Sequence, residues 1–206
     1  MPASTTAPAA TPSARRRPLA WTLKDLVLLV VLGVVFGFLY WALVQAWTGA
    51  AILFGDLTQH VLLGGWLLAA PVAIAIIRRP LAGLLAEVLA AVIEVIFLGS
   101  PVGPTLLLAA ALQGLGSELP FALTRYRRYG WLVYAFSGLL GAALVFFYSA
   151  FRSGWYGTDL LTIRLIVQLI SGVLIGGLLA KVIVDALART GVVDNFAIGR
   201  DLSRAR

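Results

Sequence analysis

The sequence predicts an all-α membrane protein with six transmembrane helices and both termini in the cytoplasm. Composition and the length of the apolar stretches carry this prediction. Of the 206 residues, 61% are hydrophobic and 12% are charged, and the mean hydropathy is +0.96. Soluble domains carry about 25% charged residues. The apolar stretches also reach the length of about 20 residues that a helix needs to cross a bilayer.

The N-terminal segment differs from the rest of the chain. Residues 1–20 are rich in Ala, Pro, Ser and Thr and include three consecutive arginines. They carry too little apolar surface to fold, so we expect a disordered cytoplasmic tail. The apolar stretch at 26–47 is too long for a signal peptide and is followed by further spans. We therefore expect one six-helix membrane domain over 21–202.

Hydropathy places six spans at 25–47, 57–77, 81–98, 104–124, 131–151 and 160–187. The basic residues test this count. All Lys and Arg residues except Arg152 and Arg164 fall before the first span, after the second, after the fourth, or near and beyond the end of the sixth. Because Lys and Arg concentrate in cytoplasmic loops, this side is predicted to be cytoplasmic.

Two acids in the third span are the first candidates for a functional site. Glu87 and Glu94 lie seven residues apart, about two helical turns, so they share one face of a helix. A carboxylate at membrane depth is costly unless it faces a partner, a cavity or a cation. That face should therefore look into the protein.

Polar residues in the fourth and sixth spans extend the candidate site. Gln113 and Glu118 lie in the fourth span and Gln168 in the sixth. Glu94, Gln113 and Gln168 are expected to meet in the outer half of the bundle. An acid, amides and aromatic rings suit a cationic heteroaromatic ligand, because they supply a counter-charge, hydrogen bonds and stacking faces. The candidate aromatic residues are Trp41, Trp66, Tyr148 and Trp155.

Other roles for these residues stay open. Glu87 and Glu118 could instead pair with basic groups near the inner surface, and Arg164 could pair with Glu94. The single histidine, His60, is expected to be an interfacial residue. The chain has no cysteine, so disulfides and thiolate metal sites are excluded, and one imidazole cannot build a His-rich metal site. We expect neither a metal nor a cofactor.

Two outer loops and one glycine pair add further expectations. Segment 98–104 is predicted to be a rigid turn because it holds two prolines and two glycines. Segment 152–159 pairs aromatic residues with glycines, and is either an interfacial anchor or a lid. Gly33 and Gly37 form a small-xxx-small pattern that lets helices pack closely in lipid. This pattern serves either internal packing or docking of a protein partner.

Several stretches resemble the YkoE-type substrate-capture (S) components of energy-coupling-factor (ECF) transporters. These stretches are RPLAGLLAE at 79–87, AAVIE at 90–94, GSPVG at 99–103, LQGLGSE at 112–118, ISGVL at 170–174 and TGV at 190–192. The resemblance runs from about Leu26 to Leu202 and is strongest in the third and fourth spans. It does not include the N-terminal tail.

The resemblance implies a six-helix protein of the bacterial cell membrane that captures thiamine, or its hydroxymethylpyrimidine precursor, from outside. Such a protein hands its ligand to a transmembrane coupling subunit driven by two ATPases. By resemblance, Glu94 or Glu118 would oppose the thiazolium charge and Gln113 would bind the pyrimidine edge, with aromatic rings enclosing both. Gly33 and Gly37 would then present the docking face for the coupling subunit.

Other function classes fit the sequence less well. No G-x-x-x-x-G-K-[ST] phosphate loop occurs, so a partner must hydrolyse ATP. An intramembrane serine protease would need a base beside its serine, and no G-x-S-x-G elbow is present. We therefore expect no enzyme activity. The alternative is a stand-alone secondary transporter of a small cationic or heteroaromatic solute, although no convincing internal repeat supports it.

Overall fold

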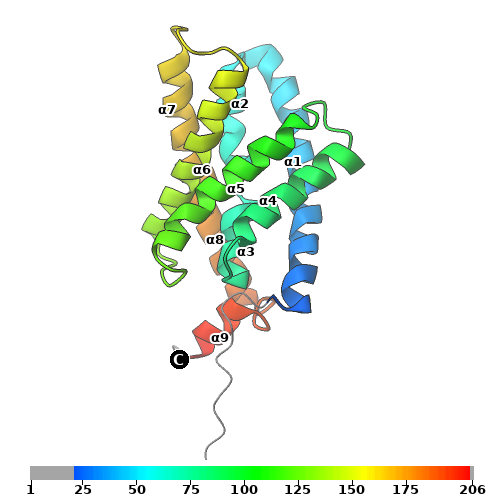
Figure 1. Ribbon diagram of the computed structural model, residues 1–206, viewed down its shortest axis with the longest axis vertical. Helices are drawn as coiled ribbons and strands as arrows, with labels where there is room; N and C mark the ends of the chain where they lie inside the picture. Colours follow the sequence, from blue (N-terminus) through cyan, green and yellow to red (C-terminus); the bar gives the residue numbers. More distant parts are fainter. Residues whose placement is uncertain (1–20, 205–206) are drawn as a thin grey trace, which may run out of the picture.

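The computed structural model describes residues 21–204, and the regular elements of this part of the chain are all helices, with no strand (Figure 1). Its elements are α1 Leu23–Phe54, α2 Leu57–Leu62, η1 Leu63–Leu67, α3 Ala69–Ile77, α4 Ala82–Val92, η2 Ile93–Phe97, α5 Thr105–Leu123, α6 Trp131–Arg152, α7 Leu161–Ser171, η3 Gly172–Leu179, α8 Ala180–Thr190 and α9 Ala197–Arg204. η1 is a 3₁₀ helix, whereas η2 and η3 are π-helical. An all-α fold is confirmed.

Five helical stretches are long and apolar enough to cross a membrane: Leu23–Leu53, Leu57–Ile77, Thr105–Leu123, Trp131–Arg152 and Leu161–Thr190. The remaining predicted span, 81–98, forms α4 with 11 residues and η2 with 5 residues. At 1.5 Å per residue this segment is about 24 Å long, shorter than the hydrocarbon core of about 30 Å. Five of the predicted spans are therefore found, and a sixth is not confirmed. Figure 1 shows α4 and α5 running obliquely to the other long helices.

Both ends of the described chain lie at one end of the molecule. Figure 1 shows the start of α1 beside α9 and the loop between α6 and α7 at the opposite end. This arrangement agrees with the predicted placement of both termini on one side. That this side is cytoplasmic remains a prediction from the basic residues. The tail at 1–20 lies outside the described residues.

A capping box starts α1 and joins it to the α3–α4 connection. The Asp25 backbone N–H donates to Thr22 Oγ1 at 3.3 Å, and the Thr22 N–H donates to Asp25 Oδ2 at 3.0 Å. These bonds satisfy backbone donors that a helix start leaves free. Asp25 also accepts from Arg79 Nε at 2.8 Å. The first span is thereby fixed where it begins.

The span Leu57–Ile77 is the most buried of the five and forms the centre of the bundle. Its middle passes so close to the start of η3 that a Cβ on Gly64 would overlap the Ser171 backbone oxygen. The Gly64 N–H instead donates to Ser171 Oγ at 2.9 Å. Glycine is therefore required at this position, and the local 3₁₀ geometry of η1 leaves its backbone amide free for Ser171.

Gly33 and Gly37 are buried between α1 and α4. A Cβ on Gly33 would lie 2.8 Å from Leu89 Cβ, and one on Gly37 would lie 2.7 Å from Ile93 Cβ. Both contacts are tighter than real Cβ atoms accept, so the glycines let two helices of the same chain approach each other. This corrects the prediction that the Gly33/Gly37 face docks the coupling subunit.

Candidate functional site

A cavity of about 420 Å³ lies at the end of the molecule opposite the described termini. Its walls come from the C-terminal end of α1, the α2–η1 segment, the N-terminal half of α5 with the turn before it, and the C-terminal end of α6 with the loop after it. The lining residues are Val44, Trp47, Thr48, Gln59, Leu63, Trp66, Pro101, Val102, Thr105, Leu106, Ala109, Gln113, Val145, Tyr148, Ser149, Arg152, Ser153 and Trp155. The volume falls within the range of about 300–1,000 Å³ that small-molecule sites occupy.

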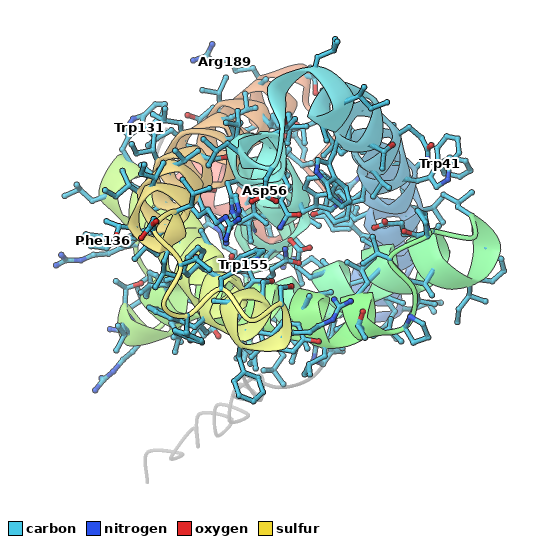
Figure 2. The ribbon with its side chains drawn as sticks, turned by 90° about the horizontal axis from the view of Figure 1, so that it is seen from above. Trp41, Asp56, Trp131, Phe136, Trp155 and Arg189 are labelled. Carbon is cyan, nitrogen blue, oxygen red and sulfur yellow. The ribbon has the colours of Figure 1, made fainter. Side chains whose placement is uncertain are left out.

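Aromatic side chains from four different segments line the cavity. Trp47 comes from α1, Trp66 from η1, Tyr148 from α6 and Trp155 from the following loop. The structure thus brings together three of the four rings that the sequence analysis selected. Trp41 is the exception: it is 37% exposed and points outward at the edge of the bundle (Figure 2). It lies on the exposed side of α1, next to the buried Tyr40.

Gln113 reaches the cavity from α5. Only 4% of this residue is exposed, and within residues 21–204 its side-chain amide makes no hydrogen bond. A buried amide normally finds a partner, so the oxygen and nitrogen of Gln113 are available to a bound molecule. Of the seven residues predicted to bind ligand, Trp66, Gln113 and Tyr148 line the cavity.

Glu94 lies beside the cavity without lining it. The π-turn η2 places this fully buried carboxylate next to the turn at 98–104, where Ser100 Oγ donates to Glu94 Oε1 at 2.9 Å. The Glu94 Oε2 atom is buried without a hydrogen-bond partner among the described residues. The two residues that follow Ser100, Pro101 and Val102, form part of the cavity wall. Glu94, which has one oxygen without a partner, is therefore tied through Ser100 to a turn that forms part of the cavity wall. Arg164, which the sequence allowed as its partner, binds Asp56 instead.

Glu87 is committed to internal hydrogen bonds. Its two carboxylate oxygens accept from the Tyr40 hydroxyl at 3.2 and 3.0 Å, and Oε1 also accepts from the Ala70 N–H at 2.9 Å. The Tyr40 oxygen in turn accepts from the Ala69 N–H at 3.0 Å. These backbone amides are free because η1 ends just before them. Glu87 therefore joins α4 to α1 and α3, and neither the ligand role nor the pairing with inner arginines is found.

Glu118 binds the start of α4. Its Oε1 accepts from the Leu81 N–H at 2.9 Å and its Oε2 from the Gly83 N–H at 2.7 Å. The Tyr126 hydroxyl also donates to Oε1, at 2.8 Å, and burial together with this hydrogen bond raises the pKa of Tyr126 well above its ordinary value. A carboxylate is stabilised at a helix N-terminus by free N–H groups and the helix dipole. Glu118 is thus a helix cap that α5 supplies to α4. It does not line the cavity, and the predicted ligand role is not found.

Gln168 binds His60 rather than a ligand. Gln168 Nε2 donates to the Ala142 carbonyl at 3.0 Å, and Gln168 Oε1 lies 2.7 Å from His60 Nδ1. His60 is fully buried, so the prediction of an interfacial histidine was wrong. The predicted meeting of Glu94, Gln113 and Gln168 is not found, because the Gln168 amide is already used within the bundle.

The loop at 152–159 contributes Trp155 to the cavity wall. In the view from above, Trp155 and Asp56 lie near the centre of the bundle, whereas Trp131 and Phe136 lie at its edge (Figure 2). This position differs from that of an anchor in the lipid interface. The loop is therefore part of the site in this structure.

Sequence reasoning missed the cavity residues Trp47, Thr48, Gln59 and Arg152. The predicted first span ended at 47, whereas α1 continues to Phe54, so Thr48 fell outside it. Trp47 and Gln59 lie within predicted spans, but hydropathy does not show that they face a cavity. A tryptophan followed by a threonine near the C-terminal end of an apolar helix was the available signal.

Comparisons with known proteins point to transport systems. Residues 24–145 match the family described as ABC-type cobalt transport system, permease component. The chain is 35% identical over 189 residues to YkoE of Bacillus subtilis (strain 168), which carries the provisional name HMP/thiamine permease protein. That match covers 91% of this chain and 94% of YkoE. A solved structure described as an S-component of ECF transporter matches with a TM-score of 0.83 and 35% identity, covering 91% of this chain and 95% of that one.

Proposed function

Because the chain belongs to the YkoE-type S components of ECF transporters, we propose that it captures thiamine or hydroxymethylpyrimidine (HMP) from outside the cell for ATP-driven uptake. It is a multi-pass protein of the cell membrane. Its relatives are components of transport systems, and we infer that it is not itself an enzyme.

The cavity is the observation that supports this proposal. Four aromatic rings, Trp47, Trp66, Tyr148 and Trp155, surround a space of about 420 Å³. Flat heteroaromatic ligands gain binding energy from stacking on such rings. The unpaired amide of Gln113 supplies a donor and an acceptor of the kind that an aminopyrimidine edge requires. Thiamine and HMP share that edge.

Glu94 supplies the counter-charge in this proposal. Thiamine carries a permanent positive charge on its thiazolium ring, whereas HMP carries none. The free Oε2 of Glu94 is buried, and a buried carboxylate interacts strongly with a cation because little water screens it. Ser100 ties the acid to the turn whose Pro101 and Val102 line the cavity. We propose that this turn moves when thiamine binds, so that the Glu94 carboxylate can approach the thiazolium ring.

Transport requires partners. The sequence contains no phosphate-binding loop, and an S component works with a transmembrane coupling (T) subunit and ATPase subunits. We propose that these partners drive the release of ligand to the cytoplasm. The Gly33/Gly37 face is occupied by α4, so the coupling subunit must dock elsewhere.

A thermal-shift screen of the purified protein tests the proposed ligand. Thiamine, HMP and an unrelated vitamin such as riboflavin would be added in separate titrations. A ligand at 100 times its Kd stabilises the folded protein by about 2.7 kcal/mol, so thiamine or HMP should raise the Tm and Gln113→Ala should reduce that rise. Stabilisation by riboflavin alone, or by none of the three compounds, would contradict the proposal.

A further inference from the structure

Trp155 is held from behind by two side chains that do not line the cavity. The His60 ring meets the Trp155 ring edge-on, with centroids 5.1 Å apart. The Arg164 guanidinium carbon lies 5.0 Å from the Trp155 ring centroid. Trp155 lines the cavity, whereas His60 and Arg164 do not. The indole therefore stands between the cavity and these two residues.

His60 is itself fixed by a chain of hydrogen bonds. Gln168 Nε2 donates to the Ala142 carbonyl of α6, which leaves Gln168 Oε1 to accept from His60 Nδ1 at 2.7 Å. This assignment places a proton on His60 Nδ1. His60 and Gln168 are buried, so the imidazole is locked in one orientation against Trp155.

Arg164 is fixed by an acid from another part of the chain. Its Nη2 lies 2.6 Å from Asp56 Oδ2, and Asp56 belongs to the turn between α1 and α2. The Arg164 side chain is only 12% exposed, and its Nε and Nη1 have no hydrogen-bond partner among the described residues. Two groups thus hold this guanidinium in place: the carboxylate of Asp56, which pairs with it, and the ring face of Trp155, over which it lies.

We propose that Arg164 and His60 are positioning residues that hold the Trp155 indole as a wall of the cavity, and that Asp56 links the α1–α2 turn to this wall through Arg164. The inference rests on the proposed ligand-binding function. Its consequence is that ligand affinity depends on residues that the ligand does not touch. A tryptophan on a loop would otherwise lose conformational entropy when a ligand ordered it.

A double-mutant cycle tests whether Arg164 acts through Trp155. The Kd for thiamine, and separately for HMP, would be measured by calorimetry on the purified full chain with Arg164→Gln, Trp155→Leu or both. We expect Arg164→Gln alone to weaken binding about tenfold and to change binding by less than about twofold when Trp155→Leu is already present. An equal loss in both backgrounds, or no loss, would overturn the inference.

The chain offers a matched control at the other end of the bundle. Lys181 pairs with Asp185 and lies 5.3 Å from the Trp131 ring centroid, so it also combines a cation, an acid and an indole. None of these three residues lines the cavity. Lys181→Gln should therefore leave both Kd values unchanged, and a loss equal to that of Arg164→Gln would contradict a specific role for the Trp155 support.

A second readout reports the position of Trp155 without ligand. In protein labelled with 5-fluorotryptophan, the ¹⁹F resonance that Trp155→Leu removes should shift or broaden in Arg164→Gln and recover in Arg164→Lys, which restores a cation near the ring. An unmoved resonance would overturn the inference.

Should Arg164→Gln fail to fold, Asp56→Asn provides the same test at a half-exposed site, with an expected loss of about threefold in affinity.

The two proposals fail in different ways. Wild-type protein that binds neither thiamine nor HMP would refute the proposed function, and the ¹⁹F spectrum would still decide whether Arg164 positions Trp155. Wild-type protein that binds, combined with an additive cycle, would refute only the positioning role.

Discussion

Glu94→Gln should separate the two proposed ligands. The substitution keeps the size of the side chain, and the new amide oxygen can still accept the hydrogen bond that Ser100 Oγ donates at 2.9 Å. It removes the negative charge of the carboxylate. One oxygen of that carboxylate, Oε2, is buried without a hydrogen-bond partner among the described residues. We expect weaker binding of thiamine, which is a cation, and nearly unchanged binding of HMP, which is neutral.

The magnitude follows from the buried position of the charge. Two opposite unit charges about 5 Å apart attract by about 3 kcal/mol at an effective dielectric constant of about 20. Removing the ligand's charge from water offsets part of this attraction. We therefore expect thiamine affinity to fall at least about tenfold, which corresponds to about 1.4 kcal/mol, whereas the affinity for HMP should change by less than about threefold.

Calorimetric titration of the purified protein with each compound measures both effects. Ser100→Ala is the control for the turn, because it removes the hydrogen bond to Glu94 and keeps the charge. Unchanged thiamine affinity in Glu94→Gln would refute the counter-charge role. An equal loss for thiamine and HMP would show that the substitution disturbs the cavity rather than its electrostatics.

Three further substitutions test the structural roles by thermal unfolding in detergent and ligand titration. Glu118→Ala removes the cap of α4 and should lower the free energy of unfolding by about 1–2 kcal/mol; unchanged stability would contradict the capping role. Glu87→Gln should lower the Tm by disturbing the Tyr40 network without changing ligand affinity, and lost binding at equal stability would move Glu87 into the site. Gly37→Leu should prevent folding, because even a Cβ meets Ile93 at 2.7 Å; a folded, ligand-competent variant would contradict internal packing.

The helical class was predictable because it depends on quantities that a sequence carries directly. Backbone polar groups in lipid must be satisfied within the segment, so long apolar stretches become helices. The limits of the five spans followed from hydropathy to within a few residues, apart from the C-terminal end of the first span, which is longer than predicted. The segment 81–98 differs because hydropathy detects apolar character, whereas crossing a membrane also requires length, and α4 with η2 is short.

The roles of the buried polar residues were harder to predict. Glu87 and Glu118 both carry the signature of a functional acid, yet each satisfies backbone N–H groups that irregular helix geometry leaves free. Those free donors arise at the end of η1 and at the start of α4, where Leu81 has a φ of 67°. Hydropathy and spacing do not reveal such local geometry. His60 and Gln168 likewise bind each other across 108 positions, a pairing that one sequence cannot show.

Several aromatic residues and Gln113, selected from the sequence, do lie around one cavity, because a cavity in a small bundle is lined by the large and polar side chains that face inward. That they bind a ligand stays a prediction. Trp66, Tyr148 and Gln113 meet in the cavity. Trp41 failed because its neighbour Tyr40 occupies the buried side of α1, and the hydrophobic pattern of a membrane helix does not distinguish a lipid-facing side from a buried one.

Uptake of labelled thiamine and HMP in cells tests the central claim most directly. The chain would be produced alone, with a T subunit and its ATPases, and with ATPases that cannot hydrolyse ATP, in a host without its own uptake systems for these compounds. As a substrate-capture subunit, it should support uptake only with the active partners, although it binds ligand when alone. Concentrative uptake by the chain alone, driven by an ion gradient, would contradict this role and identify a stand-alone secondary transporter.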